Sequence, residues 1–168
     1  MLALIVAGEA IFFLPFILPR VFRPIMLDVF EITNLELGSA FAAYGFVAMV
    51  SYFFGGPIAD RVPARNLMSM ALLGTATGGF LMATIPSFTL MTLIYAFWGM
   101  TTILLFWAAL IRATREWGNP TIQGKAFGFL DGGRGLAAAL ISTIGVTIMG
   151  SMLTFDSSDS VGLAEKTV

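Results

Sequence analysis

Three ionisable side chains lie inside stretches of sequence that are otherwise apolar: Glu9, Asp131 and Arg134. Asp131 and Arg134 are three residues apart, so on a helix they share one face and can form an ion pair. A charge inside a membrane-spanning helix costs about 2.5 to 3.5 kcal/mol, so it usually faces a partner or a cavity. The planar guanidinium group suits anions, which makes Arg134 a candidate binding group for an anionic solute.

Glu9 is expected at the same membrane depth as Arg134. Counting about 1.5 Å per residue from the helix ends puts Glu9 roughly 12 Å deep and Arg134 roughly 13 Å deep. If their helices are neighbours, the two side chains can pair across one cavity, with Glu9 as a candidate proton carrier. Two structural alternatives stay open: Asp131 only neutralises Arg134 as a helix lock, or Glu9 reaches water because its helix starts later.

Composition restricts the function classes. The chain is 58% hydrophobic and 11% charged, which indicates a lipid environment. Its net charge of -1 gives no basic surface for nucleic acid. Cysteine and histidine are both absent, so thiolate and imidazole metal sites and the commonest general base are excluded. We therefore expect neither an enzyme, a metal site nor a cofactor.

The pattern predicts an all-α membrane protein in which residues 1–155 form a bundle of about five transmembrane helices. A polar periplasmic or extracellular tail is expected at 156–168. Prolines are expected to bend the far end of the first helix, and Asn34 is expected to cap the second. Gly118, Asn119 and Pro120 are expected to form a loop. The predicted spans cover about 2–24, 37–58, 67–85, 88–111 and 124–153.

Basic residues predict the orientation of the bundle. The positive-inside rule makes the more basic side cytoplasmic, which places the N-terminus in the cytoplasm of a multi-pass inner or plasma membrane protein. The opposite side carries Arg20, Arg23 and Lys166 with an excess of acids. The side predicted to be cytoplasmic carries Arg61, Arg65, Arg112, Arg115 and Lys125.

Glycines and aromatic residues have both packing and functional interpretations. Gly74 and Gly78, and Gly128 and Gly132, have the four-residue spacing of close helix contacts. Five aromatic residues can line a solute path, although packing and lipid-facing roles are commoner for each of them. These residues are Tyr44, Tyr52, Tyr95, Trp98 and Trp107.

A charged turn joins the second and third predicted spans. Its Gly56, Asp60, Arg61 and Arg65 follow the pattern G-x-x-x-D-R-x-G-R-R/K. Pro63 stands at the place of the second glycine and Ala64 at the place of the first late basic residue. This turn resembles the loop between helices 2 and 3 of the major facilitator superfamily of secondary transporters. The run from Gly124 to Gly128 is also similar to the start of the fifth helix in its anion-transporting branches.

The resemblance implies the N-terminal bundle of an alternating-access transporter, truncated after five helices. A small anionic solute is the implied substrate, and the implied partners are the lipid bilayer and a missing C-terminal bundle of the same protein. By the same resemblance, Gly56, Asp60, Arg61 and Arg65 belong to a gating loop. The alternative is a non-transport membrane scaffold or assembly subunit whose helices bind partners through glycine contacts.

Overall fold

The computed structural model describes residues 1–165 of the chain, and residues 166–168 of the predicted tail lie outside the described residues. The described residues are almost entirely helical, which confirms the predicted all-α fold. The elements in chain order are α1 (Leu2–Phe12), η1 (Phe13–Ile17), α2 (Leu18–Val21), α3 (Arg23–Phe30), α4 (Asn34–Arg61), α5 (Ala64–Met82), α6 (Phe88–Gly99), η2 (Met100–Trp107) and α7 (Ala108–Glu165).

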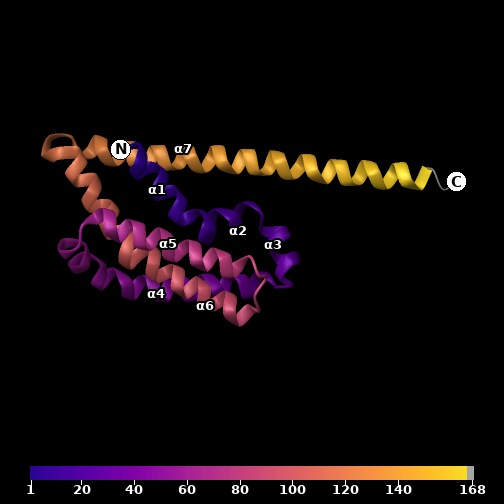
Figure 1. The fold of residues 1–168 in the computed structure, drawn as a ribbon, viewed down its shortest axis with the longest axis horizontal. Helices are drawn as coiled ribbons and strands as arrows, with labels where there is room; N and C mark the ends of the chain where they lie inside the picture. Colours follow the sequence, from indigo (N-terminus) through magenta and orange to yellow (C-terminus); the bar gives the residue numbers. More distant parts are fainter. Residues whose placement is uncertain (166–168) are drawn as a thin grey trace.

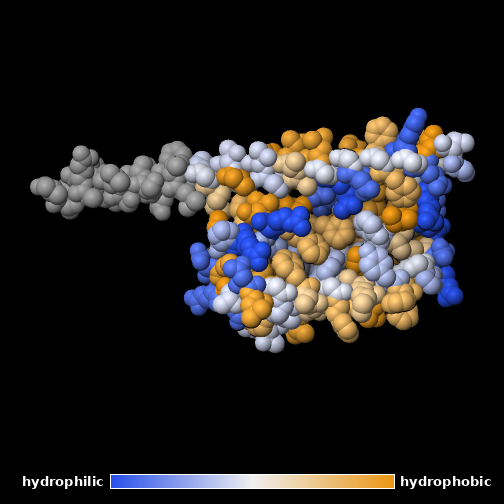
Figure 2. Space-filling view, turned by 180° about the vertical axis from the view of Figure 1, so that it is seen from behind, coloured by the Kyte–Doolittle hydropathy of each residue, from blue (hydrophilic) through white to orange (hydrophobic). Residues whose placement is uncertain are grey.

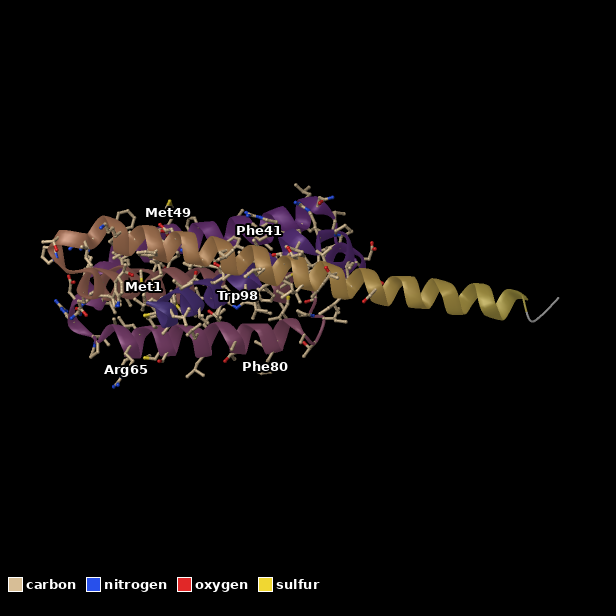
Figure 3. All side chains as sticks on the ribbon, turned by 90° about the horizontal axis from the view of Figure 1, so that it is seen from above. Met1, Phe41, Met49, Arg65, Phe80 and Trp98 are labelled. Atoms are coloured by element: carbon tan, nitrogen blue, oxygen red, sulfur yellow. The ribbon has the colours of Figure 1, made fainter. Side chains whose placement is uncertain are left out.

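The helices lie alongside one another in a bundle, and the C-terminal part of α7 extends beyond it (Figure 1). α4 packs along α6 and η2, and α1 packs along α7. Seen from above, Trp98 of α6 lies between Met49 of α4 on one side and Phe80 of α5 on the other (Figure 3). The first and last helices of the chain are therefore neighbours, and α6 forms the centre of the remaining group.

The first long helix is interrupted where prolines fall. Pro15 lies inside the π-helical segment η1, and Pro19 lies in α2. Proline removes a backbone donor and clashes with the preceding turn, so local widening or bending of the helix is expected. The direction changes at Phe22, whose φ of -108° and ψ of 33° separate α2 from α3. The proline-bent end predicted for this helix is present.

The start of α4 corrects one prediction. The cap is Thr33, and Asn34 is the first helical residue. Thr33 Oγ accepts from the backbone N–H of Glu36 at 3.2 Å, and the Glu36 carboxylate accepts from the backbone N–H of Thr33 at 2.8 Å. This reciprocal capping box satisfies two donors, whereas Asn34 as the cap would lack a glutamate three residues later.

α7 reverses its direction near residue 120 (Figure 1). A Cβ placed on Gly118 would lie 2.5 Å from Cβ of Ala126. In a straight helix, residues eight positions apart would be about 12 Å apart, so the chain must turn back between them. The backbone nevertheless remains helical through Pro120, so the loop predicted at 118–120 is wrong. Because glycine has no side chain, Gly118 leaves room for this reversal, and the backbone keeps its helical hydrogen bonding through it.

Four helical segments are long and apolar enough to cross a membrane. α5 has 19 residues and begins with Ala64, Arg65 and Asn66, so its first turn is polar. The division into five spans stays a prediction, as does the placement of the tail at 156–168, where α7 continues to Glu165. The four segments are Leu2–Val21, Asn34–Arg61, Phe88–Gly118 and Pro120–Ser151.

Buried polar groups bond to one another in the centre of the bundle. Tyr44 and Thr102 hydroxyls are 2.7 Å apart, and Thr75 and Thr101 hydroxyls are 2.8 Å apart. Trp98 Nε1 donates to the Thr75 carbonyl at 3.0 Å. An unsatisfied polar group is costly in an apolar interior, so these bonds fix α4 and α5 against the α6 and η2 segment.

Candidate functional site

Glu9 and Arg134 meet where α1 packs on α7. Arg134 Nε lies 3.7 Å from a Glu9 carboxylate oxygen, and the exposed fractions of the Arg134 and Glu9 side chains are 18% and 8%. The predicted proximity of these residues is therefore confirmed, while their functional roles stay a prediction. A buried carboxylate beside a partly buried guanidinium has its charge compensated where little water reaches it.

Glycine allows the helices to approach closely enough for this contact. A Cβ on Gly8 would lie 3.0 Å from Arg134 Cδ, and a Cβ on Gly133 would lie 2.5 Å from Ile5 Cδ1. The open backbone at Gly8 also accepts a hydrogen bond from Arg134 Nε at 3.1 Å. α1 therefore supplies Arg134 with both a carboxylate and a carbonyl acceptor.

Two aromatic rings cover the Arg134 guanidinium. Its central carbon lies 5.4 Å from the ring centroid of Phe12 and 5.7 Å from that of Trp107. These are cation–π distances, and such contacts are stronger where the cation is partly desolvated. Phe12 is carried by α1 one turn after Glu9, and Trp107 ends the π-helical segment η2. π-helical segments often occur at functional sites.

The guanidinium lines a cavity of about 350 Å³. Tyr44 and Tyr52 of α4 add two phenol groups to its wall, and Tyr44 is oriented by its bond to Thr102. By contrast, Tyr95 and Trp98 are fully buried in the core, which agrees with a packing role for both. The cavity is lined by Phe12, Tyr44, Ala48, Tyr52, Ile103, Trp107 and Arg134, and we call it the Arg134 cavity.

Asp131 completes the cluster from the solvent-exposed side. Its carboxylate lies 3.6 Å from Arg134 Nη1, and its side chain is 70% exposed. The ion pair expected from the three-residue spacing is thus present, at the exposed edge of the cluster. The cluster contains two carboxyl groups and one guanidinium, so an anion binding at Arg134 must compete with Glu9 and Asp131.

The charged turn lies apart from this cluster, at the ends of α4 and α5. Asp60 and Arg61 close α4, and Arg65 lies in the first turn of α5. Among the described residues, none of these three forms a salt bridge. A Cβ on Gly56 would meet no atom within 4 Å, whereas a Cβ on neighbouring Gly55 would lie 3.3 Å from two backbone oxygens of η2. The close approach at this turn therefore uses Gly55.

Arg112 anchors the turn to the α7 helix. Its Nη1 donates to the Ala59 carbonyl at 2.6 Å, and its Nε is 2.7 Å from Glu116. A cation near the last carbonyls of a helix is favoured by the helix dipole. In the sequence, Arg112 stands out only as part of a basic interfacial segment, because no local pattern identifies a carbonyl 53 residues earlier as its partner.

Gly8 and Phe12 were also missed as site residues. Phe12 has a readable signal, because it lies three residues after Glu9 and shares its helix face. Gly8 acts through its backbone carbonyl, and because every residue has a carbonyl, the sequence does not indicate this role. The predicted Gly128 and Gly132 contact has no neighbour within 4 Å of either position, whereas Gly74 and Gly78 pack against Thr101 and Trp98.

A family profile and two curated proteins match this chain, and all of these matches are to membrane proteins. The sequence profile of the Major Facilitator Superfamily matches residues 2–157. Inner membrane protein YihN of Escherichia coli K12 is 30% identical over 139 residues, which are 83% of this chain and 33% of that protein. Inner membrane protein YqcE of the same organism is 30% identical over 131 residues, which are 78% of this chain and 30% of that protein.

The chain therefore spans about a third of the length of the curated relatives that it matches. No solved structure matches it significantly.

Proposed function

This chain belongs to the Major Facilitator Superfamily, a family of membrane transporters, and from that premise we propose that it is the N-terminal bundle of a secondary transporter for a small anionic solute. In such transporters two bundles move about a site near the midplane, so that the site opens to one side at a time. The observation that carries the proposal is Arg134, which lines the Arg134 cavity and lies beside Glu9 of the first membrane-spanning segment.

The surroundings of Arg134 suit reversible anion binding. The guanidinium has five N–H donors, and the described contacts use the Nε donor on Gly8 and place one Nη group near Asp131. The rings of Phe12 and Trp107 hold its plane without consuming donors. The remaining donors can bind a carboxylate, sulfonate or phosphate group in the cavity.

Glu9 provides a physical reason for proton coupling. A solute anion at Arg134 leaves Glu9 as a buried carboxylate with a weakened partner. A proton bound to Glu9 removes that excess negative charge, because the neutral acid carries no penalty for an unpaired ion. We therefore propose symport of the anion with a proton, with Glu9 as the proton carrier.

The charged turn fits a gate at the end of the bundle that we place in the cytoplasm. Asp60, Arg61 and Arg65 are exposed and without salt bridges among the described residues, so they are available to a second bundle. The open positions beside Gly128 and Gly132 likewise leave room for another helix on α7. We propose that both surfaces meet the C-terminal bundle of the same protein.

Fluorescence of Trp107 tests anion binding directly. The full-length protein that contains this chain is titrated with inorganic phosphate, sulfate and gluconate in detergent, with uncharged glucose as a control solute. We expect at least one anion to change the emission of the protein, and Trp107→Phe to remove that change. Arg134→Gln is expected to abolish the response; the same midpoint in Arg134→Gln and the unmodified protein would contradict the assignment.

A further inference from the structure

A second cationic cavity lies at the opposite end of the bundle from the charged turn. It has a volume of about 300 Å³ and is lined by Phe16, Pro19, Arg20, Arg23 and Phe41. Two of these five residues are arginines, and none is acidic. Figure 2 shows hydrophilic groups in the middle of a largely apolar face, and not only at the ends of the bundle.

The break between α2 and α3 brings the two arginines to this cavity. Arg20 lies in the last turn of α2, and Arg23 is the first residue of α3. Both are exposed, and neither forms a salt bridge among the residues that the structure describes. Arg23 Nε donates to the Asn34 amide oxygen at 2.8 Å. This bond fixes one guanidinium, and no hydrogen bond among the described residues uses its Nη donors.

The carboxylate of Glu36, two residues after Asn34, is engaged in the cap of α4. It accepts hydrogen bonds from the Thr33 backbone N–H and hydroxyl, both at 2.8 Å. Asp28 and Glu31 belong to the same end of the bundle, but neither pairs with Arg20 or Arg23 among the described residues. Two guanidinium groups without a paired carboxylate in one concave site raise the positive potential within it. Such a site favours a compact oxyanion, since each guanidinium can donate two parallel hydrogen bonds to it.

An aromatic partition separates this cavity from the Arg134 cavity. Phe16 stacks on Phe41 with centroids 5.8 Å apart and planes at 7°. Phe16 also contacts Tyr44 edge-on at 4.7 Å and Phe12 at 6.1 Å. Phe16 and Phe41 line the Arg20 and Arg23 cavity, and Phe12 and Tyr44 line the Arg134 cavity. The two arginine cavities therefore share a wall of contacting aromatic rings.

We propose that Arg20 and Arg23 form a second oxyanion-binding site, which captures the solute before it passes the Phe16–Phe41 stack to Arg134. The capture role rests on the proposed transport function, whereas oxyanion binding at the pair does not. The binding site takes a phosphate- or sulfate-type group, and its affinity falls with added salt because both side chains are exposed.

Arginine protection measures occupancy at each residue. The full-length protein is treated with phenylglyoxal in a maltoside detergent without phosphate or sulfate, and modification of each arginine is followed by peptide mass spectrometry. Soluble phosphate or sulfate is then added, with sodium chloride at matched ionic strength as the control. Exposed Arg65, which has no salt bridge among the described residues, is the internal reference.

Occupancy should slow modification of Arg20 and Arg23 relative to Arg65. At an anion concentration about ten times the Kd, the slowing expected from mass action is about tenfold. Arg20→Gln should reduce the protection of Arg23, because one of the two guanidinium partners is lost. Equal rates with and without phosphate or sulfate, or equal slowing at Arg65, would overturn the proposal.

A lipid headgroup is tested as the alternative source of the oxyanion. The reaction is repeated without soluble phosphate in nanodiscs of phosphatidylcholine, with and without phosphatidylglycerol. Protection by soluble anion in detergent supports capture of a solute. Protection by phosphatidylglycerol without any effect of soluble phosphate or sulfate would assign the pair to lipid and overturn the capture role.

Two variants separate this proposal from the assignment of Arg134. Arg134→Gln should retain the protection of Arg20 and Arg23, so failure of the central site leaves this result unaffected. The double variant Arg20→Gln with Arg23→Gln should shift the anion midpoint of the Trp107 emission change to higher concentration. An unchanged midpoint would overturn the capture step.

Discussion

Arg134 and Arg65 are both arginines of the same bundle, but they have opposite surroundings. Arg134 has an exposed fraction of 18% and contacts Glu9, Asp131, a carbonyl and two rings. Arg65 is exposed and has no salt bridge among the described residues. A buried charge needs several partners to be tolerated, whereas a charge in water needs none. The number of contacts that an arginine makes therefore distinguishes a site inside the bundle from a surface that is available to a second bundle.

Replacing each arginine by alanine should give the largest contrast. Arg134→Ala leaves the Glu9 carboxylate buried without its cationic partner, so we expect a loss of about 3 to 5 kcal/mol in the free energy of unfolding. Arg65→Ala should change it by less than about 0.5 kcal/mol. Unfolding in mixed micelles, followed by tryptophan fluorescence, measures both.

A second substitution tests the cause of that loss. Glu9→Gln introduced into the Arg134→Ala protein removes the unpaired buried charge, so most of the stability should return. If the double variant is as unstable as Arg134→Ala, lost packing explains the effect and the ionic account of the cluster is wrong.

Glu9 and Asp131 should differ although both pair with Arg134. Glu9→Gln should cost about 1 to 3 kcal/mol of stability and make anion binding independent of pH, because the buried titrating group is gone. Asp131→Asn should cost less than about 1 kcal/mol, because its side chain is 70% exposed. Sulfate titrations by Trp107 emission from about pH 5 to 8 compare the two, because the charge of sulfate does not change over this range; a pH dependence retained by Glu9→Gln would exclude it as the proton carrier.

Because of Arg112, the end of α4 beside the charged turn should lose stability on substitution, as a buried site does. Arg112→Ala removes the bond to the Ala59 carbonyl and the pair with Glu116, so we expect a loss of about 1 to 2 kcal/mol. Exposed Arg115 is the matched control, with an expected change below about 0.5 kcal/mol. Hydrogen exchange at 58–62 should rise only in Arg112→Ala; the same rise in both variants would show that Arg112 is no specific anchor.

The smallest contrast concerns two adjacent glycines at the same turn. Gly55→Ala places a Cβ 3.3 Å from two backbone oxygens, which a rigid helix relieves poorly, so a loss of about 1 kcal/mol is expected. Gly56→Ala meets no atom within 4 Å and should be neutral or stabilising by about 0.5 to 1 kcal/mol, as alanine favours helices. Thermal unfolding of the two variants ranks them; the reverse order would contradict the packing of α4 on η2.

The charges of the site were predictable from the sequence, but only part of their surroundings was. Counting residues from two helix ends predicts similar depths for Glu9 and Arg134, because the rise per residue of a helix is constant. The Gly8 carbonyl and the Ala59 carbonyl could not be found in this way, since every residue has a carbonyl. Thr33 replaced Asn34 as the cap because Glu36 completes a capping box with it.

Glycine spacing was informative only where a neighbouring helix is part of the chain. Gly74 and Gly78 pack on α6 and η2, whereas Gly128 and Gly132 face open space. The pattern describes a surface that permits close contact, and it does not specify which helix makes the contact. The same reasoning applies to the charged turn, whose role as a gate stays a prediction.

Currents from solid-supported membranes test the central claim most directly, because they report charge movement by the complete protein. Proteoliposomes with the full-length protein receive rapid additions of phosphate, sulfate, gluconate and small organic phosphates and sulfonates. We predict a transient current with at least one divalent anion, because one cotransported proton compensates only one of its two charges. Arg134→Gln should abolish this current, and replacement of exposed Arg115 by glutamine should retain it. Equal currents from Arg134→Gln and the unmodified protein would contradict the role of Arg134 as the anion site.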